Sequence, residues 1–254
     1  MKFKNKILSF FSFLSAFLLT AVSCGIKKQN KNETTPGILF HTPASVTQKP
    51  QSTDSVSTVM PTESPQPTPE RIPAEDEFVR IRDYIPEIVV DLKYATTDNF
   101  TGQVIYDFTE AYARYGTVVK LKKAQEILTK RGYFIKIWDA YRPVSAQFKL
   151  WEICPDGNFV SNPNVGYSNH TRGCALDITL VDSSGNEIEM PSPFDNFTQI
   201  ADRDYSDVSE TAASNAQMLE EIIQSCGLKG YYNEWWHFND TVRYEPELEF
   251  QPPY

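Results

Sequence analysis

Two short segments that lie far apart in this chain each combine a histidine with a carboxylate. The first is Ser-Asn-His-Thr-Arg-Gly-Cys-Ala-Leu-Asp at 168–177, and the second is Glu-Trp-Trp-His at 234–237. The chain of 254 residues has three histidines, and the third, His41, lies in a segment with the composition of a linker. The folded part therefore has two histidines, each beside a carboxylate. Because so few histidines are present and both lie beside carboxylates, we expect a fold that brings the two segments together at a metal site.

The residue types in these segments suit zinc. His170, Asp177 and His237 offer two nitrogens and one oxygen, and a catalytic zinc usually has three protein ligands and one position open to water. Gly173 lets the chain turn so that His170 and Asp177 face one point. Glu234 lies three residues before His237, where a carboxylate can act as general base on a metal-activated water. From spacing alone the alternative stays open that both histidines are ordinary core or surface residues.

A third segment, Trp-Asp-Ala-Tyr-Arg-Pro at 138–143, places Arg142 where a strand is expected to give way to a helix. A guanidinium donates two hydrogen bonds from one planar group, so Arg142 suits a developing oxyanion or a carboxylate. The alternative is a surface arginine that caps a turn.

The first 24 residues have the pattern of an export signal. Lysines near the start precede a largely apolar run at 7–22, which is short for a membrane span. The run ends in Ala-Val-Ser-Cys, which resembles the lipobox of bacterial lipoproteins, although Ala21 stands where leucine is usual. We expect an exported protein that is anchored to the outer face of the cell membrane through lipidated Cys24. Cleavage to a secreted form and an uncleaved anchor remain alternatives.

Residues 25–76 are predicted to form a disordered linker, and residues 77–254 a folded domain. Eight of the 17 prolines fall in the linker, among many Ser, Thr and Gln residues. Such a segment has too little apolar surface to offset the entropy of ordering it.

The net charge of -9 argues against nucleic acid as a partner, because phosphate binding needs clustered Lys and Arg. A membrane contact is expected only through the N-terminal anchor.

The folded part mixes strands and helices without a regular βαβ repeat, which predicts an α+β fold. A turn is expected at 182–186. Strands are expected at 78–82, 88–92, 133–140, 174–181 and 231–238, and helices at 117–131, 143–151 and 213–226.

Four motifs keep a common order across residues 78–245. They are Asp-x-Lys-Tyr-Ala-Thr-x-Asp-Asn-Phe-Thr-Gly from residue 91, Trp-Asp-x-Tyr-Arg-Pro, Ser-x-His-x-x-Gly-x-Ala-x-Asp and Glu-Trp-Trp-His. This set resembles the zinc D-alanyl-D-alanine dipeptidases of the VanX type. The Ser-x-His and Glu-x-x-His parts alone also fit the related D,D-carboxypeptidases, whereas the tryptophan pair and the first motif favour the dipeptidase.

The resemblance implies a hedgehog/D,D-peptidase-like zinc domain with a central, mostly antiparallel sheet and flanking helices. It implies one Zn²⁺ per chain, with His170, Asp177 and His237 as ligands. The implied reaction is hydrolysis of a small partner, the D-Ala-D-Ala dipeptide, to D-alanine. Glu234 would be the general base and would later pass a proton to the leaving amine. Arg142 would stabilise the oxyanion.

The resemblance also implies a substrate pocket. Tyr94 and Ser168 match pocket positions, although plain packing and turn roles remain alternatives for both. Asp195 matches the acid that holds the substrate's ammonium group, and an anionic partner in a small closed pocket rejects longer peptides. Two other functions stay open: a D,D-carboxypeptidase that trims peptidoglycan stem peptides, and a non-catalytic zinc module. The second needs neither Glu234 nor Arg142.

Two features depart from the family pattern. Cys174 stands where a small residue is common, and strand alternation turns it away from the Asp177 side, so a structural role is expected. An exported chain also allows a disulfide between Cys154 and Cys226. The resistance-associated members of the family work in the cytoplasm, whereas this chain carries an export signal. Recovery of D-alanine outside the membrane therefore fits it better than glycopeptide resistance.

Overall fold

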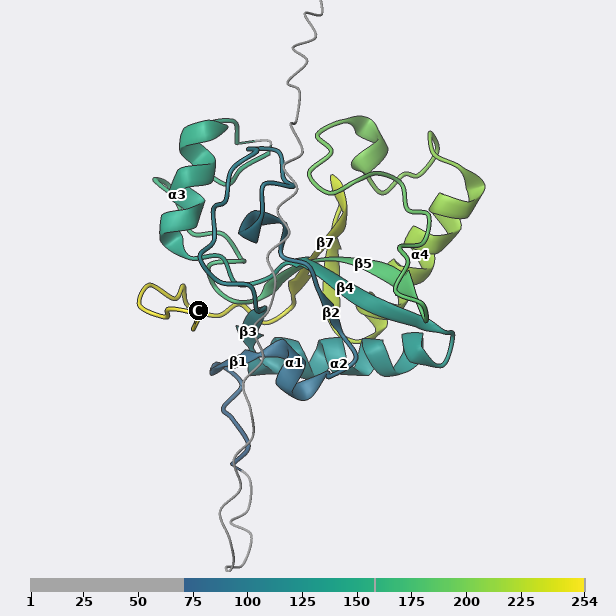
Figure 1. The fold of residues 1–254 in the computed structure, drawn as a ribbon, viewed down its shortest axis with the longest axis horizontal. Coiled ribbons are helices and arrows are strands. Elements are labelled where there is room, and N and C mark those ends of the chain that lie inside the picture. Colours follow the sequence, from purple (N-terminus) through teal and green to yellow (C-terminus); the bar gives the residue numbers. More distant parts are fainter. Residues whose placement is uncertain (1–70, 158, 254) are drawn as a thin grey trace, which may run out of the picture. The chain divides into compact units, whose positions relative to one another are not determined.

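The computed structural model describes residues 71–157 and 159–253 (Figure 1). The predicted signal segment at 1–24 and most of the predicted linker at 25–76 lie outside the described residues. Within the described ranges, no helix combines the length and the apolar character that crossing a membrane requires.

The last residues assigned to the linker take part in the fold. The backbone nitrogens of Tyr115 and Gly116 donate to the carbonyls of Glu77 and Glu75, at 2.8 and 2.9 Å. Arg71 forms an exposed ion pair with Glu77 at 2.6 Å. These contacts hold the segment before the first strand against the start of a helix.

A five-stranded sheet forms the centre of the described part. Its order is β2 (Val89–Val90), β4 (Tyr133–Asp139), β5 (Ala175–Asp182), β7 (Glu234–Asp240) and β6 (Leu228–Tyr231). β2 pairs with β4 in parallel, and the other pairs are antiparallel. A separate antiparallel pair joins β1 (Phe78–Arg80) to β3 (Tyr112–Arg114). The mostly antiparallel sheet is thus confirmed.

Helices flank this sheet, which confirms the α+β class. They are α1 (Ile81–Tyr84), α2 (Tyr115–Thr129), α3 (Val144–Ile153) and α4 (Glu210–Ser225), with short 3-10 helices η1 (Lys93–Ala95) and η2 (Gln199–Ala201). α2 packs against β4 and α4, and α4 packs against β6 and β7. Figure 1 shows α2 running beneath the sheet, with α3 and α4 on opposite sides of the view.

Several predicted elements differ from the observed ones. The strand expected at 78–82 ends at Arg80, because α1 begins at the next residue, Ile81. The strand expected at 231–238 covers the last residue of β6, a turn and most of β7, and no sequence pattern predicts β3. The helix expected to begin at Thr117 begins two residues earlier, at Tyr115. Thr117 therefore lies within α2, and its buried hydroxyl donates to Asp240 at 2.8 Å.

The considered disulfide between Cys154 and Cys226 is absent, and both cysteines are free, as is Cys174. The tertiary structure gives the reason. Cys154 follows α3 and Cys226 follows α4, and these helices lie apart, at opposite sides of the view in Figure 1.

Candidate metal centre and active site

The pairing register of the sheet brings three polar residues into one row. Asp177 on β5 lies opposite His237 on β7 and opposite Asp139 on β4. Successive side chains of a strand point to opposite faces, so Asp177 points away from the face that Leu176 and Ile178 share in the core. The row therefore lies on the face opposite those apolar side chains.

A β-bulge places Asp139 in this row. Ile137 pairs with Ile178, yet Asp139 pairs with Asp177, the very next residue on the partner strand, so the register shifts between the two pairs. Regular alternation would have left Asp139 on the same face as Ile137. The bulge turns its carboxylate to the face of Asp177 instead.

A tight turn before β5 presents His170. The backbone nitrogen of Gly173 donates to the carbonyl of His170 at 2.9 Å, and that of Cys174 donates to Asn169 at 3.0 Å. Gly173 has a φ of +70°, and a Cβ atom there would come within 2.4 Å of the Phe78 ring. Both the conformation and the space therefore require glycine, as the sequence predicted.

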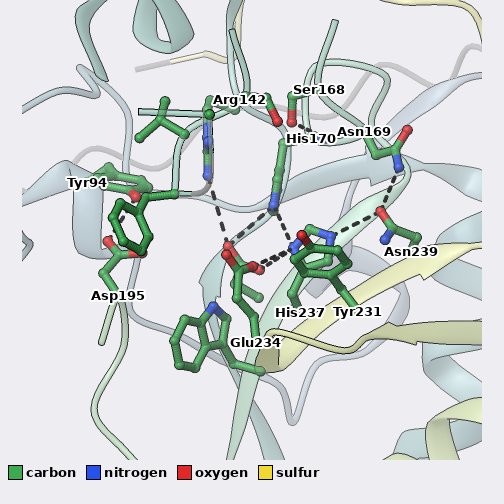
Figure 2. Close-up of a pocket in the computed structure, with 16 residues that line it drawn as sticks. Tyr94, Arg142, Ser168, Asn169, His170, Asp195, Tyr231, Glu234, His237 and Asn239 are labelled. Atoms are coloured by element: carbon green, nitrogen blue, oxygen red, sulfur yellow. Dashed lines mark hydrogen bonds and ion pairs between the residues drawn. The ribbon is translucent and has the colours of Figure 1, made fainter. Parts of the chain in front are cut away.

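The three predicted ligands converge. Asp177 Oδ1 lies 2.8 Å from His237 Nδ1, and Asp177 Oδ2 lies 3.3 Å from His170 Nε2. The same two ring nitrogens are 3.3 Å apart. Across residues 71–157 and 159–253, these three side chains are the group whose ligand atoms could hold a metal, all within 4.8 Å of one another (Figure 2). Two imidazole nitrogens and a carboxylate oxygen at this spacing fit a zinc ion.

The charges of the cluster support its role as a ligand set. Burial by itself would raise the pKa of Asp177, but the imidazoles of His170 and His237 outweigh burial and lower that pKa below its ordinary value. Burial lowers the pKa of His237, but the attraction of Asp177 and Glu234 and the hydrogen bonds to Asp177 and Asn239 together raise it above its ordinary value. Asp177 is therefore ionised, which metal coordination requires.

Glu234 lies at the edge of the cluster. Its Oε2 is 3.7 Å from His237 Nδ1, and its side chain is half-buried. Burial raises the pKa of Glu234, and the attraction of His237 offsets only part of this rise, while repulsion from Asp177 adds to it. A carboxylate with a raised pKa accepts a proton more readily, which suits a general base.

Arg142 is fixed by its neighbours. Its Nε and Nη2 donate to Asp139 Oδ2 at 3.0 and 2.6 Å, and its Nη1 donates to Gln147 at 3.0 Å. The guanidinium stacks 5.2 Å from the centre of the Tyr94 ring. Its Nη2 lies 4.0 Å from Asp177 Oδ2, so a rigid positive charge stands beside the ligand cluster.

Asp195 and Tyr94 form one wall of the site. The Tyr94 hydroxyl donates to Asp195 Oδ2 at 2.9 Å. Burial raises the pKa of Asp195 well above its ordinary value, and the negative charge of Asp177 adds to the rise although the bond from Tyr94 opposes it. Asp195 also has a φ of +54°, a conformation uncommon outside glycine. A carboxylate that ionises at such a cost gains from a cationic partner.

Every residue predicted for the site lines a single cavity of about 250 Å³. These residues are Tyr94, Arg142, Ser168, His170, Asp177, Asp195, Glu234 and His237. Ser168 also accepts a hydrogen bond from the backbone nitrogen of His170 at 3.2 Å, so it contributes to the turn as well as to the cavity. Figure 2 shows Tyr94 and Asp195 on one side of the cluster and Asn239 on the other.

Asp139, Asn169 and Asn239 contact the site residues or one another, although the motifs alone predict no role for them. A signal existed for Asp139, because an acid three residues before Arg142 lies within reach of it at a strand end. Nothing local marks Asn169 or Asn239. Cys174 is buried with its Sγ 3.6 Å from the carbonyl of Asn169, outside the ligand cluster.

Known proteins resemble this chain over the region that contains the site residues. The M15 peptidase family model, described as D-ala-D-ala dipeptidase, matches residues 74–247, which include the whole site. The D-alanyl-D-alanine dipeptidase of Escherichia coli (strain K12) is 37% identical over 162 residues, covering 64% of this chain and 83% of that protein. The enzyme of the same name from Enterococcus faecium is 34% identical over 176 residues, covering 61% and 86%. That of Enterococcus faecalis is 30% identical over 196 residues, covering 69% and 97%.

Proposed function

Because the chain belongs to the M15 family of D-Ala-D-Ala dipeptidases, we propose that it hydrolyses the free dipeptide D-Ala-D-Ala to D-alanine with one zinc ion. The observation that carries the proposal is the convergence of His170, Asp177 and His237 in one cavity with Glu234 and Arg142. A binding module would need neither the base nor the arginine.

The residues of the site divide the chemistry among them. His170, Asp177 and His237 would hold the zinc ion, which would act as a Lewis acid on the peptide carbonyl and acidify water. Glu234 removes a proton from the attacking water and then delivers it to the amine of the leaving D-alanine. Arg142 stabilises the negative charge that develops on the carbonyl oxygen, and its pairing with Asp139 and Gln147 holds it ready for this role.

The cavity favours a small substrate with a free amine. Its volume of about 250 Å³ lies below the range of roughly 300–1,000 Å³ that is typical for larger organic ligands. Asp195 offers the anionic partner that an ammonium group needs. We propose that the dipeptide lies with its ammonium at Asp195 and its peptide bond at the ligand cluster.

Hydrolysis of defined peptides tests this function. The protein with zinc is expected to cleave D-Ala-D-Ala, and to cleave its N-acetylated form about 10²-fold less efficiently, because loss of one partner of a buried charge pair costs several kcal/mol. Asp195→Asn is expected to lower kcat/KM for the free dipeptide by a similar factor. The exposed Asp107→Asn variant serves as the control, and equal cleavage of the two dipeptides would reject the role of Asp195.

A D,D-carboxypeptidase that trims stem peptides is the second candidate. The observation in its favour is a further cavity of about 220 Å³, which shares Phe159 and Glu234 with the first and gives a longer peptide somewhere to lie. The same assay separates the two functions. Release of D-alanine from a stem pentapeptide, but not from the free dipeptide, would reject the dipeptidase and establish the carboxypeptidase.

Arg142→Lys is expected to lower kcat by about 10²-fold, which is the usual cost of removing one donor to a developing oxyanion. Zinc binding is expected to change little. Lysine keeps the positive charge that Asp139 needs but loses the planar pair of donors. Steady-state kinetics on D-Ala-D-Ala measure the effect, with the exposed Arg131→Lys as the matched control. A variant with wild-type kcat would remove Arg142 from the mechanism.

The place of action remains a prediction from residues 1–24. We propose that the protein is exported and held at the outer face of the membrane through lipidated Cys24, where it recovers D-alanine from dipeptides released outside the cell. Incorporation of a labelled fatty acid, with Cys24→Ser as the control, tests the anchor. An unlabelled protein in the medium would support the secreted form instead.

A further inference from the structure

The two histidines of the cluster turn different ring atoms toward it. His170 presents Nε2 to Asp177, whereas His237 presents Nδ1. Each histidine therefore has one outer nitrogen that faces away from the cluster. The outer nitrogen of His170, Nδ1, lies 2.7 Å from the carbonyl oxygen of Ala140. That of His237, Nε2, lies 3.1 Å from Oδ1 of Asn239.

We infer that Asn239, oriented by Asn169, is a positioning residue that selects the metal-binding tautomer of His237. A neutral imidazole carries one hydrogen, and the nitrogen that binds a metal must be bare. Nδ1 of His237 is free for the metal only if the hydrogen sits on Nε2. Nε2 then needs an acceptor, and Asn239 Oδ1 is that acceptor.

The two histidines differ in how firmly the hydrogen-bond partner fixes which ring nitrogen carries the hydrogen. The partner of His170 is a backbone carbonyl, which can only accept a hydrogen bond. The partner of His237 is a side-chain amide, which offers an acceptor on one side and a donor on the other. If the amide of Asn239 turned over, its NH₂ group would face Nε2 and place the hydrogen of His237 on Nδ1. That tautomer blocks the ligand position.

Asn169 decides which way the amide of Asn239 faces. Its Nδ2 donates to Asn239 Oδ1 at 2.8 Å, so this oxygen accepts from Asn169 and from His237 together. In the reversed orientation two NH₂ groups would face each other. Figure 2 shows this chain of contacts from Asn169 through Asn239 to His237.

The backbone holds both asparagines in place. Asn239 follows His237 by two residues on β7, so both side chains share one face of the strand. Its backbone is paired on both sides, with Ala175 of β5 and Lys229 of β6. The carbonyl of Asn169 accepts from the nitrogen of Cys174 at 3.0 Å in the turn that carries His170. The amide pair thus links the two segments that supply the ligands.

Zinc affinity and the tautomer of His237 test the inference, which rests on the proposed function for the identity of the metal. Asn239→Leu is expected to weaken zinc binding about 10- to 100-fold, as loss of an outer partner of a histidine ligand does. Asn239→Asp keeps the acceptor and is expected to recover most of the affinity, and Asn169→Leu to show a smaller loss than Asn239→Leu. Competition with a chromogenic chelator measures affinity, with Asn215→Leu on α4 as the matched control.

The tautomer gives a readout that does not depend on activity. Long-range ¹H–¹⁵N NMR spectra of the zinc-loaded protein are expected to show the hydrogen of His237 on Nε2 in the wild type, and a mixture of forms with the hydrogen on Nε2 or on Nδ1 in Asn239→Leu. A zinc-loaded wild-type spectrum dominated by Nδ1–H, or full zinc affinity in a folded Asn239→Leu variant, would overturn the inference. Failure of the wild type to cleave D-Ala-D-Ala while these results hold would reject the proposed function alone.

Discussion

Replacing Glu234 with glutamine is expected to lower kcat for D-Ala-D-Ala by about 10³-fold, within the range typical of general acid–base catalysis. The amide has the size of the carboxylate but cannot accept a proton from water. Because Glu234 lies near the negatively charged Asp177, which contributes to its raised pKa, its neutral replacement removes a repulsion. The variant is therefore expected to fold and to bind zinc like the wild type.

Steady-state kinetics and metal analysis on the same preparation measure this result. Glu126→Gln is the matched control, because Glu126 is an exposed glutamate on α2, away from the cavity. A Glu234→Gln variant that contains zinc and keeps wild-type kcat would show that another group moves the proton. A loss of both zinc and activity would instead place Glu234 among the groups that hold the metal.

Asp177→Asn is expected to abolish activity by removing the metal. Asp177 is the anionic member of the cluster, and its two oxygens each contact one of the histidines. An amide keeps the shape but lacks the charge. Since loss of an outer partner alone costs 10- to 100-fold in metal affinity, loss of this ligand is expected to cost at least about 10²-fold.

A thermal unfolding experiment with zinc and with a chelator measures this change. A ligand at about 100 times its Kd stabilises the folded state by about 2.7 kcal/mol, so the wild type is expected to melt at a higher temperature with zinc. Asp177→Asn is expected to show no such difference, whereas the exposed Asp207→Asn retains it. A zinc-dependent rise of wild-type size in Asp177→Asn would exclude Asp177 as a ligand.

The local features of the site could be predicted from the sequence. The turn at Gly173 needs a glycine for its φ, and this requirement is visible in the residue itself. The helices α2 and α4 follow apolar residues at helical spacing, and their predicted ranges overlap the observed ones at most positions. The residues proposed as ligands, base and pocket wall were named from motifs, and the fold gathers them around one cavity.

Other features depended on contacts between distant segments. No local pattern marks the short β3 strand, which exists because β1 pairs with it. The disulfide considered between Cys154 and Cys226 fails because each cysteine follows a different helix, and the packing of those helices sets the distance. Asn169 and Asn239 are ordinary asparagines in the sequence, and they pair only because the turn before β5 lies beside β7.

The residue types of the site can be read from 168–177 and 234–237, where two histidines, two carboxylates and a glycine suit a metal centre. How these residues face one another depends on the pairing of distant strands. Pairing of β5 with β7 sets Asp177 opposite His237, and a bulge in β4 turns Asp139 toward them to hold Arg142. Strand register and bulges arise from the fit of whole strands against each other, so no single segment encodes them.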